Sequence, residues 1–438
     1  MSNSLNIPRV LISATGSGKG KTTVTTALLS LVKERNIDVH AAKCGPDYID
    51  PMYHESVLGV PSINLDPYFC DNEMLRACFV NAAGDMNIIE GCMGLYDGLG
   101  TTSEKSPYEV AEALSAPIIL IVDAYQKGYS IIPEISGFLN FDNSSLIKGI
   151  ILNRISESYY EKIAKTIENE TGVQVLGYMP KINEELFESR YLGLKSVEEN
   201  KASEKIKKIC EILKDTIDLD KVINIADGAK SLGFEKYIES YDYPDLNGMT
   251  IGIAKDAAFN FYYRDNIKAL ELSGAEVVYF SPLKDKYLPE DLDGLYLGGG
   301  YPELYAEQLS SNRIMLKDIK DFIEKGKPVF AECGGFMYLQ KSIENIPMVG
   351  VFSDDTVNKG KLVRFGYVEA KYGDLIIRGH EFHHFDVNDT GNEMEITKAS
   401  TGMKYKAFLR YKNCLAGFPH LYFMSQPKIL EYIYKGKI

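Results

Sequence analysis

The feature that most constrains this chain is an apolar run that leads into a glycine-rich turn and then into a helical pattern. The run reads VLISATGSGKGKTT, and the helix-forming stretch VTTALLSLV follows it directly. A strand, a tight glycine turn and a helix N-terminus in this order form a phosphate-binding loop, because free backbone N–H groups and the helix dipole both face an anion. The segment predicts a parallel α/β sheet with a nucleotide site at its edge.

Residues in and around this loop are the candidate nucleotide ligands. Lys21 can reach the β- and γ-phosphates, and Thr22 at the helix N-terminus can hold Mg²⁺. Thr15 stands where the strict G-x-x-x-x-G-K-[ST] pattern has its first glycine. The predicted strand, the Gly-Lys-Thr sequence and the predicted helix still follow one another as in a phosphate-binding loop. Asn153, which follows the apolar run GIILN, can read the nucleotide base. The predicted nucleotide-binding residues are Gly16, Gly18, Gly20, Lys21, Thr22, Thr23 and Asn153.

Acidic residues near the ends of predicted strands are the candidate metal ligands. Mg²⁺ takes hard oxygen ligands and needs only one or two carboxylates beside the phosphates of a nucleotide. Asp47 in KCGPDYIDP and Glu90 in IIEGCMGLYDG fit this role together with Thr22. Asp50 and Asp97 are weaker candidates for contacts with the substrate or the metal. For each of these residues alone, a helix cap or a solvated turn is the competing interpretation.

Short apolar runs alternate with helical patterns in two blocks of the chain. This alternation is typical of doubly wound α/β domains, in which helices cover both faces of a parallel sheet. The expected strands are 10–12, 88–89, 117–122 and 147–152 in the first block, and 249–254, 277–281, 294–297 and 328–331 in the second. Between the blocks, KASEKIKKICEILKD reads as an exposed helix, and a polar connector follows it. We expect two α/β domains, residues 1–240 and 241–438.

A cysteine lies at the sharp turn between an apolar run and a helical pattern in PVFAECGGFMYL. Such a turn exposes a nucleophile, and the helix N-terminus favours the thiolate of Cys333. Gly334, together with Gly299 and Gly300 of a second glycine run, can present N–H groups to an oxyanion. His420 in CLAGFPHLYF is the candidate general base. The competing interpretations are an inert core cysteine and a structural histidine.

The segment from His380 to His384 matches the zinc-binding pattern H-E-x-x-H. That pattern binds zinc on a helix, where residues i and i+4 share one face. Here Gly379 precedes the segment and turn-forming residues follow it. We therefore expect a loop or a strand rather than the site of a zinc hydrolase.

Charge and cysteine content restrict the partners and the compartment. A net charge of −13 argues against a protein that neutralises the phosphates of nucleic acid. Seven cysteines without a C-x-x-C pair suggest neither a disulfide framework nor a thiolate zinc site, which favours a reducing cytoplasm. No apolar run reaches the ~18 residues of a membrane span. We expect a cytoplasmic protein that binds small molecules, with neither nucleic acid nor membrane as partner. A homodimer is compatible with the sequence.

These motifs, in one order along nearly the whole chain, resemble the cobyrinic acid a,c-diamide synthase family. The segments that carry the resemblance are SATGSGKGKTT, KCGPDYIDP, IIEGCMGLYDG, the stretch from IAKDAAFNFYY to LYLGGGYPEL, AECGGFMYL and RGHEFHHF. The resemblance implies a dethiobiotin-synthetase-like, carboxylate-activating ATP domain over 1–240 and a class I glutamine amidotransferase domain over 241–438. The residues that match the family's nucleotide, metal and glutaminase motifs are Lys21, Thr22, Asp47, Glu90, Cys333 and His420.

The resemblance implies amidation of the a and c acetate side chains of a corrin ring, with ATP and glutamine, in cobalamin biosynthesis. Mg·ATP would convert a carboxylate into an acyl phosphate, and ammonia released from glutamine at Cys333 would displace the phosphate. Relatives of the family act on nickel sirohydrochlorin or hydrogenobyrinic acid, so the tetrapyrrole stays open. Tyr422 stands where the broader amidotransferase class has a glutamate, so the third member of the glutaminase site is missing or supplied elsewhere.

A function from a different class is a nucleotide-dependent switch whose second domain only binds a ligand. The intact pair Cys333 and His420 argues against this interpretation. Release of glutamate from glutamine separates the two functions, because a binding module would release none.

Overall fold

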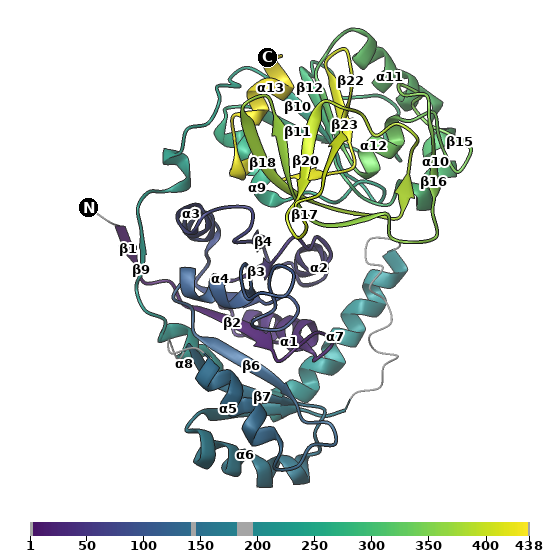
Figure 1. The fold of residues 1–438 in the computed structure, drawn as a ribbon. Coiled ribbons are helices and arrows are strands. Elements are labelled where there is room, and N and C mark those ends of the chain that lie inside the picture. Colours follow the sequence, from purple (N-terminus) through teal and green to yellow (C-terminus); the bar gives the residue numbers. More distant parts are fainter. Residues whose placement is uncertain (1–2, 142–145, 182–195, 437–438) are drawn as a thin grey trace. The chain divides into compact units, whose positions relative to one another are not determined.

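The chain is organised as two compact units, Met1–Ser240 and Tyr241–Ile438. The structure, a computed structural model, describes residues 3–141, 146–181 and 196–436. Each unit is built on its own largely parallel sheet with helices packed against it, which confirms the predicted pair of α/β folds (Figure 1). In the part of the chain that is described, no helix is both long and apolar enough to cross a membrane.

The first unit is a seven-stranded parallel sheet in the order β4-β3-β5-β2-β6-β7-β8 (Figure 1). Its strands are β2 (Arg9–Ala14), β3 (Val39–Cys44), β4 (Ser62–Leu65), β5 (Met86–Glu90), β6 (Ile118–Asp123), β7 (Ile147–Asn153) and β8 (Gln174–Met179). The four strands predicted in this block are β2, β5, β6 and β7. Because all strands run the same way, their carboxyl ends share one edge, which is where ligands bind in such sheets.

Eight α-helices in the described part of this unit pack against the sheet or beside it. They are α1 (Lys21–Glu34), α2 (Ile49–Leu58), α3 (Asn72–Ala82), α4 (Pro107–Ala113), α5 (Ile131–Phe141), α6 (Glu157–Thr171), α7 (Ser196–Thr216) and α8 (Leu219–Asp227). The core between α1 and the sheet includes Leu28 of the helix and Val10 and Ile119 of the sheet, all with no exposed surface.

The segment predicted as an exposed helix is part of this core instead. KASEKIKKICEILKD lies in α7, and the prediction of exposure is wrong because Ile206, Ile209 and Leu213 are buried in the core and α7 contacts α1. The apolar residues recur every three to four positions, which is the spacing of an amphipathic helix with one face against a core. The polar connector that follows contains α8 and a short strand, β9 (Leu232–Phe234), which pairs with β1 (Asn3–Leu5).

The second unit contains a six-stranded sheet in the order β11-β10-β12-β13-β23-β22. Its strands are β10 (Thr250–Ala254), β11 (Glu276–Phe280), β12 (Gly294–Leu297), β13 (Val329–Glu332), β22 (Leu409–Tyr411) and β23 (Cys414–Gly417). All pairings are parallel except that of β22 with β23. The four strands predicted in this block are β10 to β13. The helices of the unit are α9 (Arg264–Leu272), α10 (Ala306–Ser311), α11 (Arg313–Glu324), α12 (Gly334–Leu339) and α13 (Ile429–Lys435).

An antiparallel five-stranded sheet, in the order β21-β20-β17-β18-β24, completes this unit and was not predicted (Figure 1). Its strands are β17 (Arg364–Tyr372), β18 (Leu375–His383), β20 (Met394–Lys398), β21 (Lys404–Ala407) and β24 (His420–Leu421). A smaller sheet joins β14 (Ser342–Ile343), β15 (Ile346–Pro347), β16 (Asp355–Asn358) and β19 (Phe385–Asp386). The short β24 pairs with β18, so that His380 lies opposite His420.

Candidate active sites

The glycine-rich loop connects β2 to α1 in the first unit, as its sequence predicts. Gly18 and Gly20 have φ angles of 69° and 92°, which favour glycine over any residue with a β-carbon. A β-carbon on Gly20 would also lie 2.4 Å from Asn153 Nδ2. The side chain of Asn153 donates to the carbonyl of Lys19, with an N–O distance of 2.8 Å, and so braces the loop. Contact of Asn153 with a nucleotide base remains a prediction.

Lys21 is the first residue of α1 and folds back under the loop. Its ammonium donates to the carbonyl oxygen of Gly16 at 3.0 Å and to that of Met93. Burial and the nearby Lys43 lower the pKa of Lys21, and the acidic neighbours, Glu90 among them, offset part of this decrease. The charge of Lys21 is therefore held close to the loop, where a phosphate would lie.

Thr22 and Glu90 meet at the edge of the sheet, next to the loop. The Thr22 hydroxyl donates to Glu90 Oε1 at 2.7 Å, and Glu90 is fully buried at the end of β5. Burial acts to raise the pKa of Glu90, but Lys43 and His54 outweigh it and lower that pKa below its usual range. Glu90 is thus held as a carboxylate inside the protein.

Lys43 joins the acidic candidates into one cluster and was not predicted from the sequence. Its ammonium lies 2.9 Å from Glu90 Oε1, 2.5 Å from Asp50 Oδ2 and 4.0 Å from Asp47 Oδ2. Burial acts to lower the pKa of Lys43, yet the neighbouring carboxylates raise it well above its usual value. The structure therefore brings Asp47, Asp50 and Glu90 together around a buried cation. His54 Nε2, also not predicted, lies 3.5 Å from Glu90 Oε2.

The oxygen atoms of this cluster fit Mg²⁺. Thr22, Asp47 and Glu90 offer a hydroxyl and carboxylates, which are hard oxygen donors, and Glu90 Oε2 makes no hydrogen bond within the described residues. Across those residues no group of three or more His, Cys, Asp or Glu side chains is arranged to hold a metal alone. Mg²⁺ does not need such a group, because nucleotide phosphates and water complete its shell.

Two further acidic residues near the loop have structural partners. Asp97 Oδ2 accepts a hydrogen bond from the N–H of Gly94 at 2.7 Å and so stabilises the turn after β5. Its contact with a substrate remains a prediction. Asp123, at the end of β6, binds Lys19 at 3.0 Å and Arg154 Nε at 2.9 Å, and was not singled out in the sequence.

Cys333 lies at the turn between β13 and α12 in the second unit, as predicted. Its φ angle of 48° and ψ angle of −106° are uncommon for a residue with a β-carbon. The side chain is only 7% exposed, and the backbone N–H donates to the Gly417 carbonyl at 2.9 Å. The backbone geometry holds the thiol at the sharp turn from which a nucleophile reacts.

His420, from β24, reaches Cys333 although the two residues are 87 positions apart in the sequence. Burial acts to lower the pKa of His420, but the charge interaction and hydrogen bond with Cys333, together with the adjacent Glu332, raise that pKa to about 10. A β-carbon on Gly299 would lie 2.4 Å from the imidazole Cε1, so only glycine fits beside the ring. The geometry places a proton-transferring group next to the thiol, as nucleophilic catalysis requires.

Glu332 is the carboxylate that faces His420, and it was not predicted from the sequence. Its Oε1 atom lies 3.4 Å from His420 Nδ1 and accepts a hydrogen bond from the Tyr296 hydroxyl at 2.8 Å. Tyr422, at the position where the broader amidotransferase class has a glutamate, donates to Asp265 Oδ2 at 2.7 Å. A carboxylate in an apolar parallel strand, directly before the nucleophile, is the sequence signal that could have identified Glu332.

Two of the predicted oxyanion donors lie next to each other. A β-carbon on Gly334 would lie 3.0 Å from the backbone nitrogen of Gly300. In the described part of the chain, neither of these two N–H groups donates to a backbone carbonyl. Gly299 instead uses its carbonyl to bind the N–H groups of Asn260 and Phe261.

The H-E-x-x-H segment is not on a helix, in line with the expected loop or strand: its first four residues end strand β18, and His384 follows that strand directly. Residues of a strand rise about 3.3 Å each, so an extended segment does not bring residues i and i+4 together as one turn of a helix does. His380 is buried and stacks on His420 with ring centroids 4.9 Å apart, while His384 is exposed.

Two family models match the chain, one over each unit. The model of the CobQ/CobB/MinD/ParA nucleotide binding domain matches residues 10–190. The model of the CobB/CobQ-like glutamine amidotransferase domain matches residues 250–428.

Relatives with curated names align over almost the full length. The cobyrinate a,c-diamide synthase of Clostridium acetobutylicum is 39% identical over 439 residues, covering 97% of this chain and 99% of the relative. The enzyme of the same name from Picrophilus torridus is 38% identical over 441 residues, covering 98% of each chain. That of Listeria innocua is 39% identical over 446 residues, covering 96% of this chain and 98% of the relative.

Proposed function

The chain belongs to the cobyrinate a,c-diamide synthases, glutamine-hydrolysing ligases of cobalamin biosynthesis, and from this membership we propose that it amidates the a and c acetate side chains of cobyrinate. ATP and glutamine are the co-substrates. The observation that supports this most strongly is the hydrogen-bonded pair of Cys333 and His420, in a chain that also folds a phosphate-binding loop around Lys21.

The activation half of the reaction is proposed for the first unit. A carboxylate oxygen of the substrate attacks the γ-phosphorus of ATP, the bond to the β-phosphate oxygen breaks, and ADP leaves. Lys21 turns from the carbonyl oxygens of Gly16 and Met93 to the phosphates and offsets their charge. Thr22, Glu90 and Asp47 would hold Mg²⁺, which neutralises phosphate charge when it is bound.

The nitrogen-releasing half is proposed for the second unit. Cys333 Sγ attacks the side-chain carbonyl carbon of glutamine, and the N–H groups of Gly300 and Gly334 bind the resulting oxyanion. His420 gives a proton to the departing ammonia, and a water molecule then hydrolyses the thioester to glutamate. Ammonia attacks the acyl phosphate carbon, phosphate leaves, and one proton is lost as the amide forms.

A direct test uses the purified chain with ATP, glutamine and one tetrapyrrole at a time. The three substrates are cobyrinate, hydrogenobyrinate and nickel sirohydrochlorin, and mass spectrometry follows two successive conversions of an acid into an amide. We expect the fastest conversion with cobyrinate and one glutamate released for each amide formed. No amide with any of the three, together with no glutamate from glutamine, would support a ligand-binding switch instead.

Glu332 is proposed as a positioning residue that acts through His420. The Glu332→Gln variant keeps the shape of the side chain but removes its charge, and we expect kcat for glutamate release to fall by roughly 10- to 100-fold. Glu332 also contributes to the raised pKa of His420. Its removal lowers that pKa, so the imidazolium loses its proton at a lower pH. The alkaline limb of the pH–rate profile therefore moves to lower pH.

The matched control for this measurement is Tyr422→Phe. Tyr422 donates to Asp265 and lies outside the pair formed by Glu332 and His420, so its loss should leave the alkaline limb where it is. A rate loss in Glu332→Gln without movement of that limb would mean that Glu332 only supports the local fold.

A further inference from the structure

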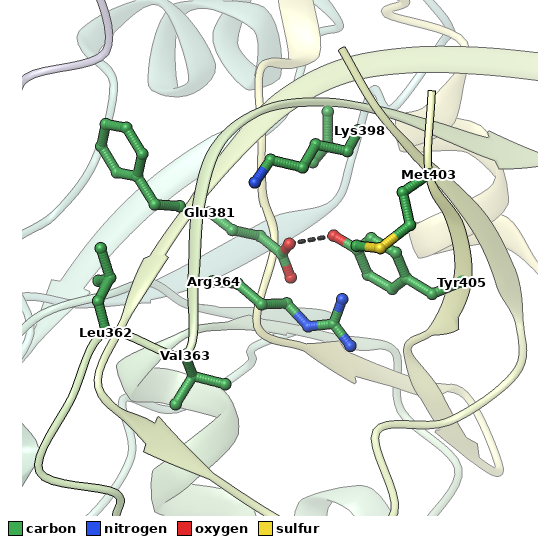
Figure 2. A pocket seen from close by; sticks show the side chains of 9 residues that line it. Leu362, Val363, Arg364, Glu381, Lys398, Met403 and Tyr405 are labelled. Atoms are coloured by element: carbon green, nitrogen blue, oxygen red, sulfur yellow. Dashed lines mark hydrogen bonds between the residues drawn. The ribbon is translucent and has the colours of Figure 1, made fainter. Parts of the chain in front are cut away.

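A pocket opens on the five-stranded antiparallel sheet of the second unit (Figure 2). It is lined by Leu362, Val363, Arg364, Phe365, Val368, Glu381, Lys398, Met403 and Tyr405. Neither Cys333 nor His420 is among these residues, so the pocket is distinct from the glutaminase site. Its volume of about 360 Å³ lies at the lower end of the range for small-molecule sites, roughly 300–1,000 Å³.

The charged groups of the pocket favour an anion. Glu381, the one carboxylate among its lining residues, is buried and accepts a hydrogen bond from the Tyr405 hydroxyl. The guanidinium of Arg364 lies 3.7 Å from the centre of the Tyr405 ring. Lys398 Nζ forms neither a hydrogen bond nor an ion pair with any described residue. Two cations against one occupied carboxylate leave a positive site on a chain whose net charge is −13.

Apolar side chains at the pocket favour a ligand with an apolar body. Phe365 is 59% exposed and Met403 is 51% exposed, so both present apolar surface at the pocket. Phe382, also exposed, packs edge-on against Phe365, with ring centroids 5.7 Å apart. Exposed apolar groups beside two cations match a ligand that combines an apolar ring with ionised acids at its edge.

We propose that this pocket binds one carboxylate arm and the adjoining ring edge of the tetrapyrrole polycarboxylate. The inference rests on the proposed function and adds a binding site for its acid substrate on the glutaminase unit. Lys398 pairs with the carboxylate as a point charge, and Arg364 presents its remaining N–H groups to it. Phe365 and Met403 cover the ring edge. The small volume fits an arm and a ring edge rather than the whole macrocycle.

The other co-substrates fit this pocket less well. Glutamine has to reach Cys333, which does not line the pocket, and it has no apolar ring for Phe365 and Met403 to cover. The phosphates of ATP have a loop of their own in the first unit. The tetrapyrrole is the co-substrate with both an apolar ring and several carboxylates.

Binding of cobyrinate to the full-length chain, measured by absorbance titration without ATP and glutamine, tests the proposal. We expect Lys398→Met to weaken binding by roughly 10-fold, the size of one lost charge-assisted hydrogen bond. The KM for cobyrinate should rise by a similar factor, while kcat and KM for glutamine hydrolysis stay unchanged. Lys398 is the residue of choice because its ammonium has no partner in the described chain. Its removal therefore leaves no other group without a hydrogen-bond or ion-pair partner.

The matched control is Lys406→Met, which removes an exposed lysine of the same sheet that lies 3.9 Å from Glu395. This variant should bind cobyrinate within about 2-fold of wild type, because surface ion pairs contribute little. A second control is a corrinoid whose carboxylates are all amides. It should bind wild type and Lys398→Met equally.

The outcomes separate this inference from the proposed function. If wild type amidates cobyrinate while Lys398→Met binds it as tightly as wild type, the pocket assignment is overturned and the function stands. If cobyrinate is not amidated but nickel sirohydrochlorin binds in a Lys398-dependent way, the pocket assignment is supported and the choice of cobyrinate fails.

Discussion

Replacing Cys333 with alanine is expected to lower glutamine-dependent amidation by roughly 10⁴-fold or more, while amidation with ammonium chloride continues. The thiol is the atom that would form the thioester, and His420 has no other nucleophile to activate at that turn. Free ammonia needs neither group. Glutamate release and amide formation, measured with each nitrogen source, therefore separate the two halves of the reaction.

Cys414→Ala is the matched control for the cysteine variant. Cys414 is buried in β23 and pairs in register with Val329 of β13, four positions before Cys333. It should retain activity with both nitrogen sources. Glutamate release by Cys333→Ala at the wild-type rate would show that the nucleophile has been misidentified. Loss of the ammonia-dependent rate as well would show that the two activities are not separable.

Replacing Lys21 with alanine is expected to lower amidation by roughly 10³-fold with glutamine and with ammonia alike, because the activation step precedes both. The ammonium of Lys21 is buried next to the loop, and water cannot supply an equally fixed charge there. Glutamate release in the absence of ATP should stay close to the wild-type rate, because Cys333 and His420 belong to the other unit.

Lys33→Ala is the control for the lysine variant. Lys33 lies in the last turn of the same helix and donates to the carbonyl oxygens of Leu58 and Gly59, away from the loop. Binding of Mg·ATP by titration calorimetry should weaken in Lys21→Ala and not in Lys33→Ala. Normal amidation by Lys21→Ala would exclude this loop as the site of activation.

The sequence alone was sufficient to predict local structure and candidate site residues where one short segment carries both the fold and the chemistry. The loop before Lys21 and the turn at Cys333 each combine a strand, a tight turn and a helix within about fifteen residues. Such segments dictate their own conformation. The parallel strands were predictable as well, because strands buried on both faces are continuously apolar.

Other parts of the sites depend on the order of strands, which no local pattern encodes. Lys43 reaches Glu90 because β3 and β5 are neighbours in the sheet, although the two residues are 47 positions apart in the sequence. Glu332 faces His420 only because β24 pairs with β18 at the end of the chain. The antiparallel sheet was missed for a related reason. Its strands carry many charged residues, and one-sided burial leaves them without a continuous apolar run.

The backbone at Cys333 has a consequence for how this chain can change over generations. A residue with a β-carbon at a φ angle of 48° costs about 1 kcal/mol or more relative to glycine, so glycine at position 333 would stabilise the fold. Selection for folding alone would therefore favour glycine at this position, and the proposed role of Cys333 in taking nitrogen from glutamine would oppose that change. In a lineage that lives on abundant ammonia, we expect this position to be among the first to drift, and to drift toward glycine.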